Sequence, residues 1–336
     1  MNNPKTAIIL VNYRTPFYLN LCLKSIFRNT NTDDFRLFLV HNEPDDLSIR
    51  IGEKYKRKYT NCIDITIHQK NLGLVGAINS VYEKTCKFDY ICLINSDIVV
   101  TKNWLDALVY VLDTDKDVVQ VTASFYHDHS LSLIEKLFKF LSKVTVNTFL
   151  ENLVSLLQLN YAIRKWNKAY KQEEANKYDI SDFVFDFCSG ACNIFRAKFF
   201  TNLGYYCDPN IVHGYGDDFD LTYYLRQFGK IAVCNNIFIF HFLNKSLHKI
   251  GNGKYYFKTK LQFLNELYVF YKWKDRILRD LQNIDINVLV DLINTNQFFK
   301  NMLSFMFLIQ NNTNDINVIL DINKRKEIAR NLGIFA

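Results

Sequence analysis

The chain has 336 residues, of which 49% are hydrophobic and 22% are charged. This length allows one large domain with additional segments, or two domains, and the low content of proline (four) and glycine (eleven) excludes fibrous and disordered classes. The net charge of +7 indicates a solvated basic surface, an anionic ligand or an anionic membrane, whereas no basic block or zinc-finger pattern suggests a nucleic-acid partner.

The first 125 residues alternate between apolar runs and amphipathic segments. Strands are expected at residues 7–12, 36–41, 63–68, 90–95 and 118–124. Helices are expected at residues 17–29, 74–86 and 104–112. Continuous apolar strands separated by amphipathic helices are typical of a parallel sheet covered on both faces. The sequence therefore predicts an α/β fold with a mostly parallel central sheet flanked by helices.

The pattern changes after residue 126. From about 127 to 180 apolar residues recur at helical spacing among many lysines and arginines, which predicts a helical insertion. Two interpretations stay open for it, namely helices packed on the core, or a basic amphipathic face that contacts a membrane or a partner. Further on, a helix that begins near Asp217 and ends at Gly229 and two short strands within 231–242 are expected.

We expect a domain of residues 1–250, with the insertion inside it, and a mainly helical region of residues 251–336. The eight cysteines lack C-x-x-C spacing, which indicates reduced thiols and a cytoplasmic location. The apolar part of the N-terminus is too short for a signal peptide, and no run of about 18 apolar residues predicts a spanning helix. Peripheral contact with the inner face of the membrane stays open.

Polar or basic residues follow four predicted strands. They are Asn12, Tyr13 and Arg14 (with Val11 before them), His41 and Asn42, Lys70 and Gly73, and Asn95, Ser96 and Asp97. Each alone is an ordinary turn residue, but parallel strands end at one edge of a sheet, where such folds bind ligands. An aromatic ring can stack on a base, amides can hydrogen-bond it, and basic groups can meet phosphates. Asp97 could then hold Mg²⁺ or Mn²⁺, which prefer carboxylate and phosphate oxygens.

At these residues the chain resembles family 2 of the inverting, nucleotide-sugar-dependent glycosyltransferases, which have the GT-A fold of nucleotide-diphospho-sugar transferases. The similarity extends from about Ala7 to Ser246, interrupted by the insertion. It rests on six segments in the family's order, which are AIILVNYRT, NLGLVGAINSVYE, LINSDIVV in the N-x-D form of the D-x-D motif, CSGACNIFR, GYGDDFDLTYYLRQFG, and His241 five residues before Ser246.

The resemblance implies roles for matching positions. Asp97 and His241 correspond to ligands of a divalent cation, Mn²⁺ or Mg²⁺, that stabilises the departing diphosphate. Asp218 corresponds to the general base, and Asp217 replaces the usual glutamate and is expected to bind the acceptor; crowded carboxylates raise proton affinity. Three further substrate contacts are implied, at Asn79, Gly190 and Ala191.

The chain also departs from the family pattern. His41 stands where an aspartate commonly reads the base, so the resemblance leaves the donor open between a UDP-sugar and a dTDP-sugar. The expected reaction is metal-dependent, inverting transfer of a sugar to a hydroxyl of a glycan or of a lipid-linked glycan. The alternatives are a sugar nucleotidyltransferase, whose glycine-rich loop after the first strand is missing here, and an inactive carbohydrate-binding homologue.

Overall fold

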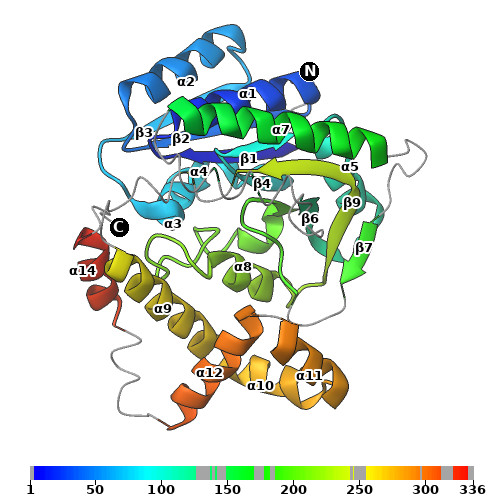
Figure 1. Ribbon diagram of the computed structural model, residues 1–336, viewed down its shortest axis with the longest axis vertical. Coiled ribbons are helices and arrows are strands. Elements are labelled where there is room, and N and C mark those ends of the chain that lie inside the picture. Colours follow the sequence, from blue (N-terminus) through cyan, green and yellow to red (C-terminus); the bar gives the residue numbers. More distant parts are fainter. Residues whose placement is uncertain are drawn as a thin grey trace.

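The structure is a computed structural model, and it describes residues 4–125, 137, 141, 149–169, 178–181, 186–242, 245, 255–295, 297–311 and 321–331. A nine-stranded sheet forms its centre, with helices on both faces (Figure 1). The α/β class predicted from the alternation of apolar runs is therefore confirmed.

Four parallel strands form one half of the sheet, in the order β3-β2-β1-β4. Asn12 at the end of β1 lies opposite His41, and Asn42 lies opposite His68, so the strands end at the same level. This half agrees with the apolar runs of the sequence, and its strands are β1 (Thr6–Asn12), β2 (Phe35–Asn42), β3 (Ile63–His68) and β4 (Tyr90–Asn95).

The other half of the sheet is mixed. Beyond β4 the order is β8-β6-β9-β5, and β8 is antiparallel to both of its neighbours. The strands are β5 (Ile98–Val100), β6 (Val118–Phe125), β7 (Tyr178–Ser181), β8 (Cys192–Arg196) and β9 (Lys230–His241). The prediction of two strands within 231–242 was wrong, because β9 is continuous. Asn235, in the middle of β9, donates a hydrogen bond to Asp179 of β7.

The two faces of the sheet bury separate cores. On β1, Ile8 and Leu10 face α1 and α5, whereas Ala7 and Ile9 face α3, α8 and α9. This alternation follows from the period of two in a strand. The helices are α1 (Pro16–Asn29), α2 (Asp46–Lys58), α3 (Gly73–Asn79), α4 (Tyr82–Thr85), α5 (Trp104–Thr114), α8 (Asp217–Leu225) and α9 (Tyr255–Lys272).

Three helices differ from the prediction. The helix expected at 74–86 is two helices, α3 and α4, because the chain leaves helical geometry at Val81. Helix α8 ends at Leu225, four residues before the predicted Gly229. Helix α2 was not predicted, since its sequence is mostly polar; its signal is the cap, in which the Asp45 side chain accepts a hydrogen bond from the Ser48 N–H.

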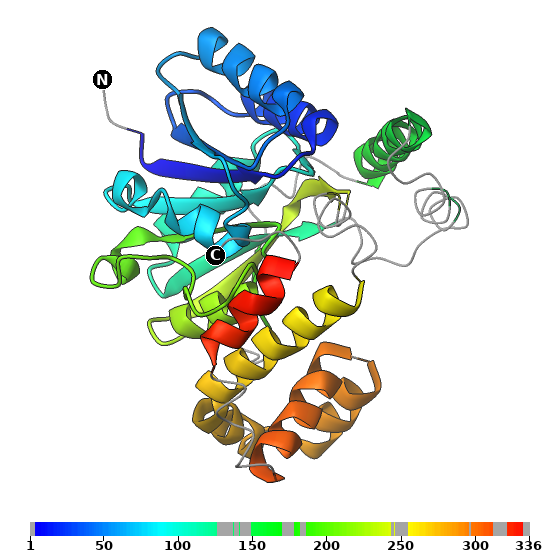
Figure 2. The ribbon, with the colours of Figure 1, turned by 90° about the vertical axis from the view of Figure 1, so that its left-hand side faces the viewer.

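Helical structure is confirmed within the expected insertion by α7 (Phe149–Ala169); residues 127–136, 138–140, 142–148 and 170–177 lie outside the described residues. The C-terminal region is helical as predicted, and α9 is followed by α10 (Lys274–Gln282), α11 (Ile286–Thr295), α12 (Gln297–Asn311) and α14 (Ile322–Asn331) (Figure 2). Among the residues that the structure describes, no helix combines the length and the apolar character needed to cross a bilayer.

Candidate active site

A pocket with about 330 Å³ of empty space, open to solvent, lies at the carboxyl ends of β1 and β4. Five residues predicted for the site line it: Val11, Asn95, Gly190, Asp217 and Asp218. The rest of its wall is mostly apolar and consists of Ile9, Leu74, Ile78, Leu93, Ile94, Asn193 and Leu221. The fold therefore joins residues that lie far apart in the sequence at the predicted edge.

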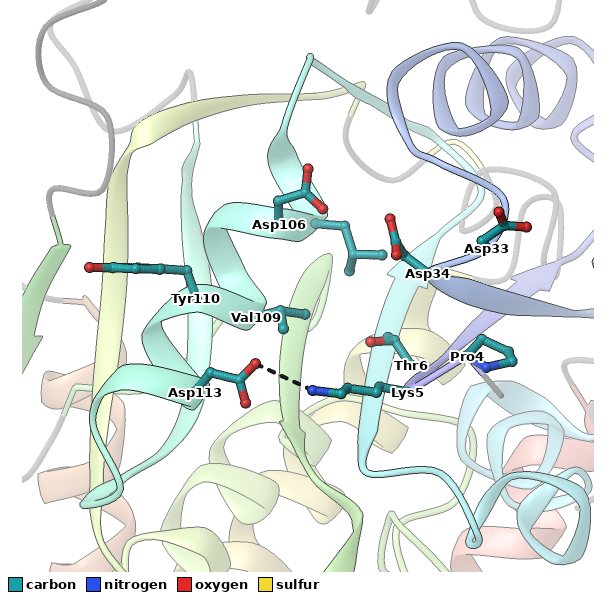
Figure 3. A pocket seen from close by; sticks show the side chains of 10 residues that line it. Pro4, Lys5, Thr6, Asp33, Asp34, Asp106, Val109, Tyr110 and Asp113 are labelled. Carbon is teal, nitrogen blue, oxygen red and sulfur yellow. Dashed lines mark ion pairs between the residues drawn. The ribbon is translucent and has the colours of Figure 1, made fainter. Parts of the chain in front are cut away.

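A larger hollow of about 960 Å³, also open to solvent, lies at the opposite ends of the strands (Figure 3). It separates the start of β1 from α5, and Lys5 there pairs with Asp113 at 4.0 Å. Asp33, Asp34 and Asp106 face the same hollow, and burial together with the Asp34 charge raises the pKa of Asp106. None of the predicted site residues lines this hollow, so the candidate active site is the smaller pocket.

Asp97 and His241 face each other directly beyond the end of β4. Ile98 of β5 pairs with His241 of β9, and this register brings the two side chains together. His241 Nε2 lies 3.1 Å from Asp97 Oδ1, and the Lys245 backbone N–H donates to Asp97 Oδ2 at 3.1 Å. Burial alone would raise the pKa of Asp97, but the His241 charge and these hydrogen bonds hold it below its ordinary value.

The Asp97–His241 pair fits a divalent cation. A carboxylate oxygen and an imidazole nitrogen that converge at 3.1 Å can both bind one ion in place of their hydrogen bond. No third histidine, cysteine, aspartate or glutamate joins them in the described part of the chain. Such a site suits Mg²⁺ or Mn²⁺, because Mg²⁺ in particular commonly completes its coordination with water and substrate phosphates.

A buried ion pair ties α7 to this part of the site. Glu151 on α7 accepts hydrogen bonds from Lys245 Nζ at 2.9 Å and from the Tyr18 hydroxyl at 2.8 Å. Tyr18 also hydrogen-bonds Ser155, one turn further along α7, at 3.1 Å. None of these four residues was predicted from the sequence. The position of Lys245, four residues after His241, was a usable signal, whereas nothing in the sequence around Glu151 indicates this contact.

Asn12 and Ser96 lie beneath the edge of the sheet. Thr15 connects them, because its hydroxyl donates to Asn12 Oδ1 at 2.8 Å and lies 3.2 Å from the Ser96 hydroxyl. All three side chains are buried, and Asn12 Nδ2 has no hydrogen-bond partner among the described residues. These residues join the ends of β1 and β4 and leave one amide donor for a bound molecule or a water.

Tyr13 and Arg14 form the outer rim after β1. The Arg14 guanidinium lies 5.5 Å from the centroid of the Tyr13 ring and pairs with Glu43 at 3.0 Å. Burial raises the pKa of Tyr13, so the phenol stays neutral and offers its ring and hydroxyl. Arg14 is thus held by Glu43 in this structure, whereas the predicted Lys70 is exposed on the neighbouring loop.

Asn42 and Gly73 shape the loop between β3 and α3. The Asn42 amide donates to Asn71 Oδ1 at 2.8 Å and to the Gly73 carbonyl at 3.2 Å, and it accepts from the Leu72 N–H at 2.8 Å. Gly73 has a φ of +75°, and a Cβ there would lie 2.5 Å from the Cα of His213. These two predicted residues therefore fix the loop backbone, and only a glycine fits at position 73.

Asn79 was predicted to contact substrate, but the structure uses its side chain elsewhere. Its amide donates to the Cys207 carbonyl at 2.7 Å and accepts from the N–H groups of Tyr206 and Cys207 at 3.0 and 3.1 Å. These three bonds engage both ends of the amide. Asn79 therefore anchors the 206–207 turn to α3, and it does not line the pocket.

His41 was predicted to bind the base, but the structure buries it on the α2 face of the sheet. A Cβ at Gly52 of α2 would lie 2.6 Å from His41 Nε2, and the His41 side chain is 0% exposed. Strand alternation explains the difference, since Asn42 faces the loop of the site and its neighbour must face the opposite side. Burial lowers the pKa of His41 to about 4, so the ring is neutral at pH 7.

Replacing His41 with leucine is expected to make the fold less sensitive to acid. The unfolded histidine binds a proton near pH 6.5 and the folded one only near pH 4, so wild-type stability is lost as the pH falls through this window. The loss should reach about 2–3 kcal/mol near pH 4.5. Urea denaturation at pH 7.5, 5.5 and 4.5 measures the free energy of unfolding, with His68→Leu as the control. If wild type and His41→Leu lost the same stability on acidification, His41 would not be the buried, neutral histidine described here.

Two adjacent carboxylates at the start of α8 border the pocket. Asp218 Oδ2 accepts from the Gly190 N–H at 3.4 Å, and Asp218 Oδ1 accepts from the Phe219 N–H at 3.0 Å. Burial raises the pKa of Asp218, and burial together with the Asp218 charge raises the pKa of Asp217 to about 7. The pair therefore retains a proton near neutral pH more readily than an exposed aspartate does.

The Gly190–Ala191 turn lies between the acidic pair and β4. The Asn95 N–H donates to the Ala191 carbonyl at 3.0 Å, which fixes the turn against the end of β4. A Cβ at position 190 would lie 3.4 Å from the Asp218 Cβ. The third acid, Asp220, faces away from the pocket and pairs with Lys272 at 2.7 Å, so it holds α9 against α8.

Comparison with protein families gives one family whose model matches residues 7–204, described as glycosyl transferase family 2. EpsH of Bacillus subtilis (strain 168) is 28% identical over 119 residues, which cover 35% of this chain and 33% of EpsH. The chain spans a third or less of the length of the curated relatives that it matches.

Two solved structures share the fold across 98% of this chain. A mannosyltransferase, PcManGT of Pyrobaculum calidifontis, in complex with GDP-Man and Mn²⁺, is 10% identical with a TM-score of 0.52, and 85% of its chain is covered. TarS of S. aureus, in complex with UDP-GlcNAc, is 12% identical with a TM-score of 0.52, and 79% of its chain is covered. At these identities the similarity establishes the GT-A fold alone.

Proposed function

The chain belongs to glycosyl transferase family 2, and from this premise we propose that it is a metal-dependent, inverting enzyme that moves a sugar from a UDP- or dTDP-sugar to a hydroxyl of a glycan or a lipid-linked glycan. One observation carries the proposal. The Asp97–His241 pair converges just beyond the end of β4, and the Asp217–Asp218 pair, whose proton affinity is raised, lines the pocket at the same edge of the sheet.

The Asp97–His241 pair is proposed to act on the leaving group. Asp97 and His241 would hold the cation, Mn²⁺ or Mg²⁺, which neutralises the charge that develops on the departing nucleoside diphosphate. The complexes of PcManGT with GDP-Man and Mn²⁺ and of TarS with UDP-GlcNAc, which share the fold, support a cation and a nucleotide sugar as ligands. The Tyr13 ring offers a surface for the base, and Asn12 Nδ2 offers a hydrogen-bond donor.

The Asp217–Asp218 pair is proposed to act on the acceptor hydroxyl. Asp218 lines the pocket together with Val11 of β1 and would take the proton of the attacking hydroxyl, while Asp217 would position that hydroxyl. A base placed across the sugar from the leaving diphosphate leads to direct displacement and hence inversion at the anomeric carbon. The Gly190–Ala191 turn beside Asp218 leaves room for the acceptor, because a larger residue at 190 would contact that carboxylate.

We place the enzyme in the cytoplasm, since all eight cysteines are free thiols and seven of them are buried. We assign residues 1–250 to the GT-A part, with an insertion at about 127–180, and residues 251–336 to a mainly helical region.

The donor is identified by thermal stabilisation. A ligand that binds only the folded protein at 100 times its Kd stabilises it by about 2.7 kcal/mol, so the matching UDP- or dTDP-sugar with Mn²⁺ should raise the Tm by about 3–6 °C. Without metal, or in Asp97→Asn, the rise should disappear. Equal shifts with and without Mn²⁺ would overturn the metal-dependent proposal. Release of pyrophosphate from UTP or dTTP in the presence of a sugar 1-phosphate would indicate a nucleotidyltransferase.

A further inference from the structure

The outward face of α7 carries an unusually exposed set of large apolar side chains. Phe149 is 81% exposed, and Leu150, Leu153 and Leu157 are 56%, 45% and 50% exposed. The spacing of these four residues places them on one side of the helix. They form a stripe about 12 Å long, given a rise of 1.5 Å per residue. We call these four residues the α7 stripe.

The opposite face of α7 fixes the direction in which the stripe points. Ser155, Leu159 and Ala162 are buried against the body of the protein, and Glu151 is held by the ion pair with Lys245. Leu159 and Ala162 belong to a core cluster that they share with β9. The helix thus already has its packing face, and the α7 stripe is a second apolar face directed away from the protein. Figure 2 shows α7 standing at one side of the sheet.

The charge of α7 indicates what covers the stripe. Glu151 is the only carboxylate between residues 149 and 169, and it is buried in its ion pair. Arg164 and Lys165 are exposed beyond the carboxyl end of the stripe, and Arg164 lies in line with it. The surface of this helix therefore offers apolar side chains followed by cations, without an exposed carboxylate. This pattern is typical of helices that lie in the interface of an anionic bilayer.

A second copy of the chain fits this surface poorly. Pairing two α7 stripes would bring two helices with exposed cations together, in two chains that each carry a net charge of +7. An anionic lipid surface instead complements both features of the helix. We propose that α7 docks on an anionic lipid bilayer, with the α7 stripe inserted among the acyl chains and Arg164 and Lys165 at the headgroups. This proposal rests on α7 alone and does not depend on the reaction.

Vesicle co-sedimentation tests the proposal. The full chain is expected to bind phosphatidylglycerol-containing vesicles, and to bind pure phosphatidylcholine vesicles at least tenfold more weakly, with binding to anionic vesicles falling as salt increases. Leu153→Ser together with Leu157→Ser should weaken binding to anionic vesicles about tenfold or more. Arg164→Glu should weaken it and reduce its dependence on salt.

The matched control is Val290→Ser with Ile293→Ser, which changes two exposed apolar residues of α11 in the same way. The control should bind as wild type does, and unchanged thermal unfolding of each variant shows that the fold is kept. The proposal is overturned if the α7 variant binds as tightly as wild type, if wild type binds neither vesicle, or if wild type is a dimer that Leu153→Ser with Leu157→Ser converts to a monomer. Donor stabilisation measured without vesicles reports separately on the proposed function.

Discussion

Replacing Asp97 with asparagine is expected to lower sugar transfer by about 10²–10³-fold, the loss typical when one group that stabilises developing charge is removed. The asparagine keeps the size of the side chain, its Oδ1 can still accept from the Lys245 N–H, and its amide N–H can donate to His241 Nε2, so the fold should survive. It removes the negative charge that would hold the cation. Transfer rates measured against Mn²⁺ concentration should therefore show a large loss together with a much weaker response to metal.

The matched control for Asp97→Asn is Asp64→Asn on β3, a partly exposed carboxylate that pairs with Arg36 and Lys84. Surface ion pairs of this kind contribute at most about 1 kcal/mol, so the control should transfer sugar at nearly the wild-type rate. If Asp97→Asn retained full activity and the same metal response, the cation would have to be held elsewhere.

Asp218→Asn is expected to lower transfer by about 10²–10⁴-fold, the usual contribution of a general base, while donor stabilisation with Mn²⁺ stays near the wild-type value. The carboxamide Oδ1 can still accept from the Phe219 N–H, and only the longer bond of 3.4 Å from the Gly190 N–H is lost, so the start of α8 should keep its shape. Loss of donor binding in this variant, or full transfer by it, would contradict the assignment of Asp218 as the base.

The pH profile tests the same pair. Because the pKa of Asp217 is raised to about 7 and that of Asp218 is also raised, the wild-type rate should increase as the pH rises through about 7 and the pair loses its proton. In Asp217→Asn the neighbouring charge is gone, so the acid limb of the residual activity should move to lower pH. An unmoved acid limb would mean that another group limits the rate.

The parallel half of the fold was predictable because its strands are buried on both faces and therefore read as continuous apolar runs. The four runs that became β1 to β4 agree with the structure to within one residue at each end. Helix α2 was not predictable in this way, since most of its surface is solvated and only Ile51 and Tyr55 pack on the core. The break between α3 and α4, where Val81 leaves helical geometry, follows the contact of Asn79 with the distant turn at Cys207, which no local pattern indicates.

The position of the site at one edge of the sheet was predictable from the sequence. Asn12 and Asn95 were expected at one edge of the sheet, and they lie at the ends of the neighbouring parallel strands β1 and β4. The direction of each side chain was less predictable: the period of two in β2 turns His41 beneath α2 and leaves Asn42 at the edge. Glu151 could not be found from the sequence, because its partner lies 94 positions away and no motif links them.

The Glu151–Lys245 ion pair connects α7 with the proposed metal site. Lys245 contacts Glu151 through its ammonium group and Asp97 through its backbone N–H, so a shift of α7 along its axis would act on a residue that also holds the Asp97 carboxylate. Coupling between two binding events is reciprocal. If contact of α7 with a surface raised the affinity for the donor by some factor, bound donor would raise the affinity for that surface by the same factor. A chain built in this way would distribute itself between surface and bulk according to how much nucleotide sugar the cell holds.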